Sequence, residues 1–240
     1  MIYLILPSYN EEKNLVKMFK QINNLKVASN IIVILIDDCS IDNTMALKST
    51  KNKFKIIYKR HPRNMGLSIA LESGFNLVTN KAKNNDLIVT MDSDNTHPIK
   101  IIPRMMDVLV NNNSDIVIAS RFLPTSKING LSFLREFLSW TAKHIYSFAF
   151  PYKNLKEYTG NFRIYRSDLI KKLMKNRKFF KNEDFNIVVK ILLFFIKNIK
   201  KLKISEYPLI LNYQHKMGAS KMRIGRNIFF TLKLILMRKF

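Results

Sequence analysis

Cysteine, linker-like segments and long hydrophobic runs are all scarce in this sequence. One cysteine, Cys39, among 240 residues excludes an internal disulfide framework and a zinc site built from cysteines, and it is typical of a reducing compartment. The six glycines and seven prolines are scattered, and there is no linker, internal repeat or low-complexity segment. We therefore expect a single domain, for which the 47% hydrophobic content provides an ample core.

No uninterrupted apolar stretch is long enough to cross a membrane. The two best candidates, 187–196 and 228–237, are short and are interrupted by Lys190 and Lys233. The first residues, Met-Ile-Tyr-Leu-Ile-Leu-Pro, lack the basic region that opens a signal peptide. We expect a protein that is soluble or bound to a membrane surface.

Acidic residues are also few. The chain has 17 acidic and 41 basic side chains, which gives a formal net charge of +24. Such a charge favours an anionic partner: nucleic acid, an acidic membrane surface or a phosphorylated ligand. The composition is rich in lysine, asparagine and isoleucine, a bias that raises the charge without any functional demand. We therefore use the charge only as supporting information.

The most informative segment is an acidic pair at the end of a predicted strand. Residues 87–91 form a short apolar, β-branched run typical of a buried strand, and Asp92 and Asp94 follow it. Alternation along the strand lets both carboxylates point the same way. Such a pair repels itself unless a cation joins it, and hard oxygen ligands suit Mg²⁺ or Mn²⁺. The alternative is that Asp94 and Asn95 only form a turn or a helix cap.

The first 120 residues alternate between predicted strands and helices. Strands are expected at 2–6, 31–36, 54–58, 87–91 and 115–119, and helices at about 11–24, after residue 44, at 67–78 and at 99–110. This order predicts an α/β fold with a doubly wound, mainly parallel central sheet flanked by helices. Ligands bind such sheets beyond the carboxyl ends of the strands. The polar residues that follow these strands are Tyr9, Asp38, Asp92, Asp94 and Arg121.

These loops also allow a purely structural interpretation. Tyr9 and Glu11 could stack on and hydrogen-bond a nucleoside, whereas Asn10 beside them could simply cap the next helix. Asp38 suits a ribose or the edge of a base, while Asp42 could be no more than an N-cap. The residues alone leave both interpretations open.

The second half of the chain is less regular. We expect a loop at 123–130, a long apolar segment at 131–150, an alternating strand at 158–166, a helix at about 182–200 and, because of Pro208, an edge strand at 204–213. Residues 214–221 form a polar loop with His215 and Lys221, which is either solvated or closes over phosphates. The basic, amphipathic tail at 223–240 either packs on the core or lies in a membrane interface.

Seven segments of the chain together resemble a known family. They are Pro-Ser-Tyr-Asn-Glu at 7–11, Ile-Asp-Asp-Cys-Ser-Ile-Asp-Asn-Thr at 36–44, Asn-Met-Gly-Leu at 64–67, Met-Asp-Ser-Asp-Asn-Thr-His-Pro at 91–98, Ser-Arg-Phe at 120–122, Gly-Asn-Phe-Arg-Ile-Tyr-Arg at 160–166 and Gly-Ala-Ser-Lys at 218–221. In this order and spacing the chain resembles the family 2 glycosyltransferases of GT-A fold, most closely the dolichol-phosphate (polyprenyl-phosphate) mannosyltransferases. The resemblance implies one Rossmann-like GT-A domain over 1–240. Its parts would be a nucleotide-sugar-binding half at 1–122, an acceptor half with the closing loop at 123–222, and a basic amphipathic helix at 223–240.

The resemblance also implies a role for each matching residue. The nucleotide sugar would be bound by Pro7, Tyr9, Glu11, Ile36, Asp38, Asp92, Ser93, Asp94, His215 and Lys221. The ion, Mg²⁺ or Mn²⁺, would be held by Asp92, Asp94 and Thr96, and the acceptor phosphate by Arg121 and Arg135. Asp94, Arg121 and Lys221 would be the catalytic residues.

Three positions depart from the family's motifs. Thr96 stands where the metal motif usually has glutamine, so a shorter hydroxyl, or a water on it, would have to reach the ion. His215 stands where the closing loop usually has arginine, and a neutral histidine weakens phosphate binding near pH 7 and makes it pH-dependent. Cys39 replaces the usual glycine or asparagine after the aspartate pair.

The implied activity is metal-dependent transfer of a sugar, mannose from GDP-mannose, to a polyprenyl or dolichyl phosphate, with inversion. The implied location is peripheral, at the cytoplasmic face of a membrane, and a membrane-anchored subunit is a conceivable further partner. One alternative is the same fold acting on a glycan in surface-polysaccharide synthesis, with Glu183 or Asp184 as base. A transferase inactivated by Thr96 and His215 is another.

A basic nucleic-acid-binding protein is a remote alternative, because no known module pattern is visible and we expect no nucleic-acid partner. Neither G-x-G-x-x-G nor a Walker loop occurs, which disfavours a dinucleotide-binding oxidoreductase.

Overall fold

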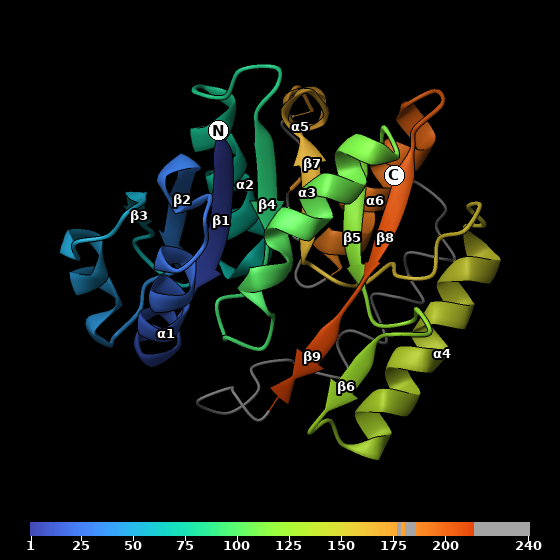
Figure 1. Cartoon of the computed structure of the whole chain (residues 1–240), viewed down its shortest axis with the longest axis horizontal. Coiled ribbons are helices and arrows are strands. Elements are labelled where there is room, and N and C mark those ends of the chain that lie inside the picture. Colours follow the sequence, from blue (N-terminus) through green and yellow to red (C-terminus); the bar gives the residue numbers. More distant parts are fainter. Residues whose placement is uncertain (177–178, 181–185, 214–240) are drawn as a thin grey trace.

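The chain is built around one large sheet, seen in the computed structural model of Figure 1, which describes residues 1–176, 179–180 and 186–213. Its strands are β1 (Ile2–Ser8), β2 (Ile31–Asp37), β3 (Lys55–Arg60), β4 (Leu87–Thr90), β5 (Ile116–Ser120), β7 (Arg163–Arg166) and β8 (Ile204–Pro208). The strand order is β3-β2-β1-β4-β7-β5-β8. Only β7 runs antiparallel to its neighbours in this sheet, between β4 and β5. The mainly parallel sheet predicted from the sequence is therefore confirmed.

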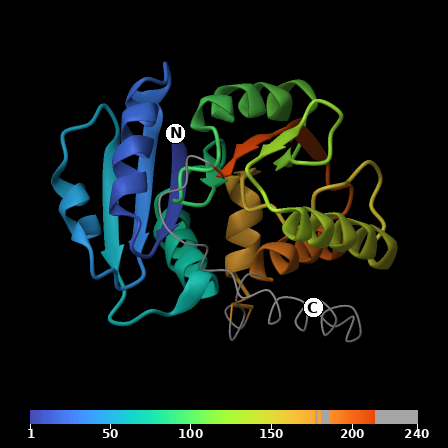
Figure 2. The same ribbon diagram turned by 90° about the horizontal axis from the view of Figure 1, so that it is seen from below.

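Helices cover both faces of the sheet. The α-helices are α1 (Glu12–Asn23), α2 (Gly66–Thr79), α3 (Ile102–Asn111), α4 (Phe133–Ala149), α5 (Ser167–Met174) and α6 (Ile187–Asn198), and 3₁₀ helices lie at η1 (Ala28–Asn30), η2 (Asn43–Ser49) and η3 (Ile99–Ile101). The α1 and α3 helices lie over one face, and α2, α5 and α6 lie over the other (Figures 1 and 2). A second, two-stranded sheet pairs β6 (Lys127–Asn129) with β9 (Ile210–Asn212). It lies near α4, beyond the carboxyl ends of the main strands (Figure 1).

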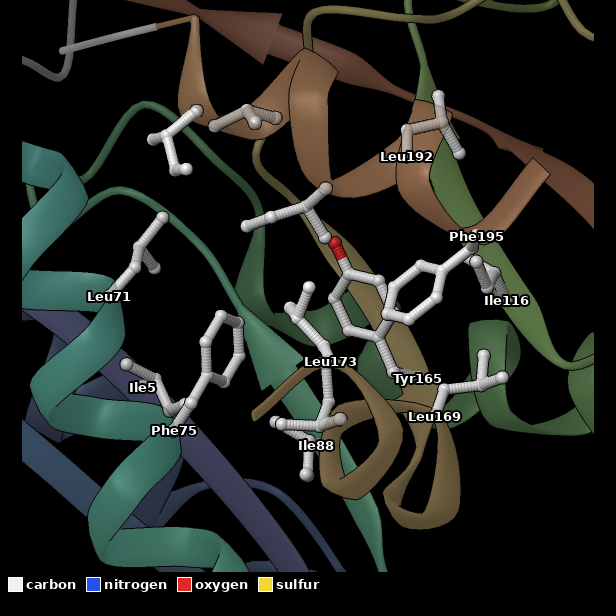
Figure 3. Close-up of a cluster of buried hydrophobic side chains, with 14 of the residues drawn as sticks. Ile5, Leu71, Phe75, Ile88, Ile116, Tyr165, Leu169, Leu173, Leu192 and Phe195 are labelled. Atoms are coloured by element: carbon white, nitrogen blue, oxygen red, sulfur yellow. The ribbon is translucent and has the colours of Figure 1, made fainter. Parts of the chain in front are cut away.

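Two hydrophobic cores follow from the period-two alternation along the strands. In β1, Ile5 faces the core under α2, while its neighbours Leu4 and Leu6 face the core under α1 and α3. The α2 core is shown in Figure 3, where Phe75 of α2 lies over Ile5 and Tyr165 of β7 lies beside Phe195 of α6. Because both faces of the sheet's centre are buried, β1, β2 and β5 consist largely of apolar residues, mostly Ile, Val and Leu.

Helix α2 packs unusually close to β1. A Cβ built on Gly74 would lie 2.5 Å from Cγ2 of Ile5, well inside van der Waals contact. Both residues are buried, so neither has room to withdraw. Glycine is therefore required at this point by the distance between the helix and the strand.

Several local expectations need correction. The alternating segment 158–166 is a strand only from Arg163 onward, and its first half is a loop. The segment 204–213 is an edge strand as far as Pro208, as predicted, but then continues as β9 in the second sheet. The expected loop 123–130 contains β6, and the helix expected after residue 44 is the 3₁₀ helix η2. Helix α5 was not predicted.

The two halves expected from the sequence share the large sheet. Strands β7 and β8 come from the half expected at 123–222, and they pair with β4 and β5 of the half expected at 1–122. The assignment of a donor and an acceptor role to the two halves stays a prediction.

Candidate functional site

The predicted site residues follow strands that end at one edge of the sheet. The parallel strands β1, β2 and β4 end at Ser8, Asp37 and Thr90, and β5 ends at Ser120. The loops that leave this edge carry Tyr9, Asp38, Asp92, Asp94 and Arg121. The fold therefore places these five residues where ligands of doubly wound sheets bind.

Asp38 is anchored to the start of α2. Its carboxylate accepts hydrogen bonds from the backbone N–H groups of Met65 and Gly66, each at 2.8 Å. Nδ1 of His61 lies 2.7 Å from the same carboxylate, and Nε2 of His61 lies 2.9 Å from the hydroxyl of Ser73. Gly66 has a φ of 82°, a conformation that glycine adopts without strain. Asp38 is thus a buried anchor that holds the β2 loop and the start of α2 together.

Contacts between β1 and its neighbours fix the rest of the predicted nucleoside pocket. Pro7 pairs with Ile36 in the β1–β2 ladder, and the hydroxyl of Ser93 donates to the carbonyl of Pro7 at 2.6 Å. Ile36 has no exposed surface and packs in the core under α2. The predicted direct contact of Ile36 with a nucleoside is therefore not available in this structure, and Ile36 could shape such a pocket only from beneath. Glu11, at the N-cap of α1, accepts a hydrogen bond from Nδ2 of Asn14 at 2.6 Å.

Of the two helix caps expected at Asp42 and Asn10, the structure shows only the one at Asp42. Asp42 caps η2, since its side chain accepts from the backbone N–H of Thr44 at 3.1 Å. It also accepts from the backbone N–H of Glu12 at 3.0 Å and so links η2 to the start of α1. Asn10 does not cap α1. It has a φ of 53°, and its side-chain oxygen accepts from the backbone N–H of Ile41 instead.

The acidic pair lies directly after β4. Asp92 is half-buried, and one of its oxygens accepts from Nδ2 of Asn161 at 3.0 Å. Asp94 is also half-buried, and its Oδ1 accepts from the backbone N–H of Thr96 at 3.1 Å and from the Thr96 hydroxyl at 2.7 Å. Asn95, between Asp94 and Thr96, has a φ of 60°, and its side-chain oxygen accepts a hydrogen bond from Nε2 of Gln21. The turn expected at Asp94 and Asn95 is therefore present.

The donor set of this loop fits a divalent ion that is shared with a substrate. Among the described residues, no group of three or more His, Cys, Asp or Glu side chains could hold a metal by itself. Asp92 and Asp94 supply hard carboxylate oxygens, and the hydrogen-bond donors described for them are neutral. Mg²⁺ is commonly bound in this way, by one or two carboxylates, substrate phosphates and water. Thr96 is 4% exposed and donates to Asp94, so its role as a direct ligand stays a prediction.

A cleft of about 770 Å³ borders the same loop on the side of α1 and α3. Thr96 and His97 contribute to its wall, together with the cationic side chains of Lys100 and Arg104. Asp92 and Arg121 do not line it. Of the predicted site residues, Thr96 therefore borders this cleft, whereas Asp92 and Arg121 do not.

Arg121 forms a two-pronged ion pair with Glu157. Its Nε and Nη2 atoms donate to the two carboxylate oxygens at 2.8 and 2.9 Å, and Nη2 also donates to the hydroxyl of Thr159 at 2.6 Å. Glu157 is completely buried, and the Arg121 side chain is 15% exposed. Burial opposes ionisation of Glu157, but the charge and hydrogen bonds of Arg121 and the N–H groups of Gly160 and Thr159 outweigh it and lower its pKa to about 2. Burial opposes the charge of Arg121, but the charge and hydrogen bonds of Glu157 outweigh it and raise the pKa of Arg121, with a smaller electrostatic contribution from Asp92.

Helix α4 reaches the same region through Lys143, which lies over the ring of Phe122. The ring of Phe122 lies 5.4 Å from the guanidinium of Arg121 and 5.2 Å from the ammonium of Lys143 in α4. Such distances allow a cation–π attraction of the ring to each of the two cations. Arg135, predicted to bind the acceptor phosphate, lies eight residues before Lys143, about 12 Å away along the helix. It is half-buried in the first turn of α4.

Some predicted residues lie outside the described part of the chain. His215 and Lys221 of the expected closing loop are among them, as are Glu183 and Asp184. Conversely, the structure adds residues to the site that were given no role from the sequence. These are Glu157, Thr159, Asn161 and Lys143. The only sequence signal for the first three was their position in or just before the segment 160–166.

Comparison with known proteins shows the family to which the chain belongs. The family model described as "Glycosyl transferase family 2" matches residues 3–174. A dolichol-phosphate mannosyltransferase of Pyrococcus furiosus is 30% identical over 236 residues, which cover 98% of this chain and 62% of that protein. A polyprenol monophosphomannose synthase of Mycolicibacterium smegmatis is 25% identical over 173 residues, or 71% of this chain and 63% of that protein. The chain thus spans less than two thirds of the length of both relatives.

Solved structures agree on the fold. The glucosyl-3-phosphoglycerate synthase of Mycobacterium tuberculosis, crystallised with Mn²⁺ and UDP-glucose, superposes with a TM-score of 0.66 at 15% identity, covering 98% of this chain and 78% of that chain. At this identity the likeness shows the fold alone, which is the GT-A fold expected from the sequence. The match over residues 3–174 and the 30% identical relative together show that the chain belongs to glycosyl transferase family 2.

Proposed function

We propose that this family 2 glycosyltransferase moves mannose from GDP-mannose to a polyprenyl phosphate, with inversion at the sugar carbon. The observation that carries the proposal is that the acidic pair after β4 and Arg121 after β5 are brought together at one edge of the sheet. Carboxylates suited to a metal-bound diphosphate would then lie at the same edge of the sheet as a cation suited to a second phosphate. The names of the two relatives support a phosphorylated lipid as the acceptor.

On the donor side, the chain's own residues would hold and orient the nucleotide. Tyr9 would stack on the base, and Glu11 and Asp38 would accept hydrogen bonds from the nucleoside, with Pro7, Ile36 and Ser93 shaping the pocket. Asp38 is held by three groups, the ring of His61 and the backbone N–H groups of Met65 and Gly66, so such a pocket would be preorganised. His215 and Lys221 would contact the diphosphate.

Asp92 and Asp94 would hold Mg²⁺ or Mn²⁺, with Thr96 orienting Asp94 or serving as a further ligand. When bound, the ion supplies positive charge that stabilises the leaving diphosphate. Asn161 and Thr96 donate hydrogen bonds to the two carboxylates and thereby keep them in place for that role.

On the acceptor side, no general base is required. A phosphate monoester has a second pKa of about 6, so it is already a dianionic nucleophile at neutral pH. Arg121 would orient this phosphate through hydrogen bonds of fixed direction, and Arg135 would contact it or the lipid beyond it. The two phosphates would thereby meet between Asp92 and Arg121.

The exposed face of α4 supports a membrane surface as the location of the acceptor. Large apolar side chains stand out from this helix, among them Phe133 at 84% exposure and Phe148 at 90%, together with Trp140 at 53%. Lys143 and Arg135 lie on the same helix, and the chain as a whole is strongly basic. A helix of this kind lies in the interface of an anionic bilayer. Of the helices that the structure describes, none has the length and apolarity needed to span a membrane.

The test is transfer of radiolabelled mannose from GDP-mannose to a short polyprenyl phosphate, with Mg²⁺ or Mn²⁺ and with a chelator. UDP-glucose and UDP-N-acetylglucosamine serve as competing donors, and Asp94→Ala is the control variant. We expect a lipid product that needs the metal and is lost in Asp94→Ala. Metal-dependent nucleotide binding without a lipid product from any donor would contradict the lipid acceptor and favour a glycan.

A further inference from the structure

We propose that Glu157 is a positioning residue for Arg121, the residue assigned above to the acceptor phosphate. The inference rests on the proposed function and adds to it a residue that does not itself touch either substrate. Its starting point is the short segment 157–161, which contacts Arg121 at one end and Asp92 at the other. One segment thus touches both the acceptor side and the donor side of the site.

The Glu157 carboxylate is held tightly on both of its oxygens. Its Oε1 accepts from the backbone N–H groups of Thr159 and Gly160, at 3.0 and 2.9 Å, and from Nη2 of Arg121 at 2.9 Å. Its Oε2 accepts from Nε of Arg121 at 2.8 Å. A Cβ on Gly160 would lie 3.2 Å from Cγ and Cδ of Glu157, so the turn closes directly onto the carboxylate. The carboxylate therefore has one position, and the arginine edge that it binds is fixed with it.

The fixed carboxylate of Glu157 sets the orientation of the Arg121 guanidinium. Nε and Nη2 form the edge that faces Glu157, and Thr159 takes a further bond from Nη2. Within the described residues, no hydrogen bond of Nη1 is found. A guanidinium presents its donors in a rigid plane. Fixing one edge therefore fixes the direction of Nη1, the nitrogen that remains for a phosphate oxygen.

The backbone around Glu157 is held in place by side chains of two strands of the main sheet. Oε1 of Glu206, on β8, accepts from the backbone N–H groups of Lys156 and Glu157 at 2.8 and 2.6 Å. Nη2 of the buried Arg163, on β7, donates to the carbonyl of Tyr158 at 2.6 Å. The backbone on both sides of Glu157 is thus tied to two strands of the main sheet. A binding group supported in this way loses little conformational entropy when the ligand arrives.

The experiment compares Glu157→Gln with the wild-type protein. Glutamine has the same shape, but its amide nitrogen would face N–H donors, so at least one bond to Arg121 is lost. The two quantities measured are the KM for the polyprenyl phosphate and the KM for the nucleotide sugar. We expect the acceptor KM to rise about tenfold and the donor KM to stay within about twofold. Equilibrium binding of the polyprenyl phosphate, without donor, should weaken by the same factor.

A second pair of variants tests whether Glu157 acts through Arg121. If it does, adding Glu157→Gln to Arg121→Met should cause no further loss of acceptor binding, because there is no guanidinium left to position. Additive losses in the double variant would overturn the proposal. So would an unchanged acceptor KM in a folded Glu157→Gln, or equal rises in the two KM values.

The role of Glu157 can still be tested if Glu157→Gln does not fold or if the wild-type protein transfers no sugar to a lipid. If Glu157→Gln does not fold, Thr159→Val removes the hydroxyl at Nη2 and keeps the ion pair, and it should raise the acceptor KM by about threefold; no change there overturns the positioning role. If the wild-type protein transfers sugar to no lipid but binds polyprenyl phosphate, the proposed function fails while the binding measurements still decide the role of Glu157. Absence of both transfer and lipid binding overturns the two together.

Discussion

Replacing Glu157 by glutamine should remove one of the largest pH-dependent contributions to the stability of this protein. Glu157 is fully buried and is ionised because Arg121 and two backbone N–H groups bind its carboxylate. Its pKa is lowered from an ordinary value of 4.5 to about 2. A carboxyl with a depressed pKa in the folded state stabilises the protein above the unfolded pKa. That stabilisation is lost as the pH falls toward the folded pKa.

The size of the effect follows from the pKa difference. At 1.36 kcal/mol per pKa unit, a fall from 4.5 to about 2 corresponds to about 3 kcal/mol of folding free energy near neutral pH. Mutational data on buried ion pairs give a similar figure, about 3–5 kcal/mol when one partner is removed. Because both groups are shielded from solvent, little of this is screened. The Glu157→Gln variant should therefore be less stable by about 3 kcal/mol at pH 7.

The assay is urea unfolding of the two proteins at a series of pH values from 7 to 3. The difference in free energy of unfolding should be constant down to about pH 5 and then shrink as the pH falls below 4.5, because only the wild-type protein loses this contribution. The pKa of Glu206 is raised by burial and, to a smaller extent, by the charge of Glu157, so the substitution also lowers the pKa of Glu206 and this group does not cancel completely in the difference.

Asp168→Asn is the matched control, since Asp168 pairs with Lys172 at 3.8 Å on the surface. It should change the stability by less than about 0.5 kcal/mol at any of these pH values. A difference between Glu157→Gln and wild type that does not vary with pH would refute the reasoning, because it would show that the ionisation of Glu157 contributes nothing.

Three further predictions concern the fold and the surface. Gly74→Ala places a Cβ 2.5 Å from Ile5 and should lower stability by roughly 1–3 kcal/mol in thermal unfolding, whereas Asn76→Ala, on the exposed side of α2, should have little effect. Asp42→Ala removes the cap of η2 and the bond to the α1 start, and should cost about 1–2 kcal/mol in urea unfolding; a neutral result would mean that other groups replace both bonds. Phe133→Ser with Trp140→Ser should reduce co-sedimentation with phosphatidylglycerol vesicles severalfold, while Ile41→Ser, equally exposed on η2's loop, should not.

Much of the fold could be predicted from the sequence because the signals are local. The short, β-branched apolar runs of β1, β2 and β5 favour strands of a sheet covered on both faces, and helices alternate with them along the chain. That order predicts a mainly parallel sheet, and a parallel sheet brings the loops after its strands to one edge. Tyr9, Asp38, Asp92 and Arg121 could therefore be identified as candidates before any contact between them was known.

The hydrogen bonds and ion pairs that connect the site residues could not be predicted, because no local sequence pattern reveals them. The sequence predicts a strand through 158–166, yet the polar groups of Thr159 and Gly160 bind the Glu157 carboxylate and do not join a ladder. The position of Asp38 directly after a strand predicts a ligand-binding residue. The structure shows that its carboxylate also binds the backbone at the start of α2. Hydrogen-bonding capacity is a property of a residue, but its partner is set by the fold.

The position of β7 between β4 and β5 is set by the tertiary structure and could not be predicted from the sequence. Hydrophobic periodicity fixes which residues are buried, but the choice of strand neighbours depends on long-range packing and loop closure. By running antiparallel between β4 and β5, β7 carries the segment before it to the carboxyl edge of both strands. Glu157 thereby meets Arg121, 36 residues away in the chain, and Asn161 meets Asp92, 69 residues away. The sequence determines the sheet and its candidate residues, and the place of this one strand decides how they act together.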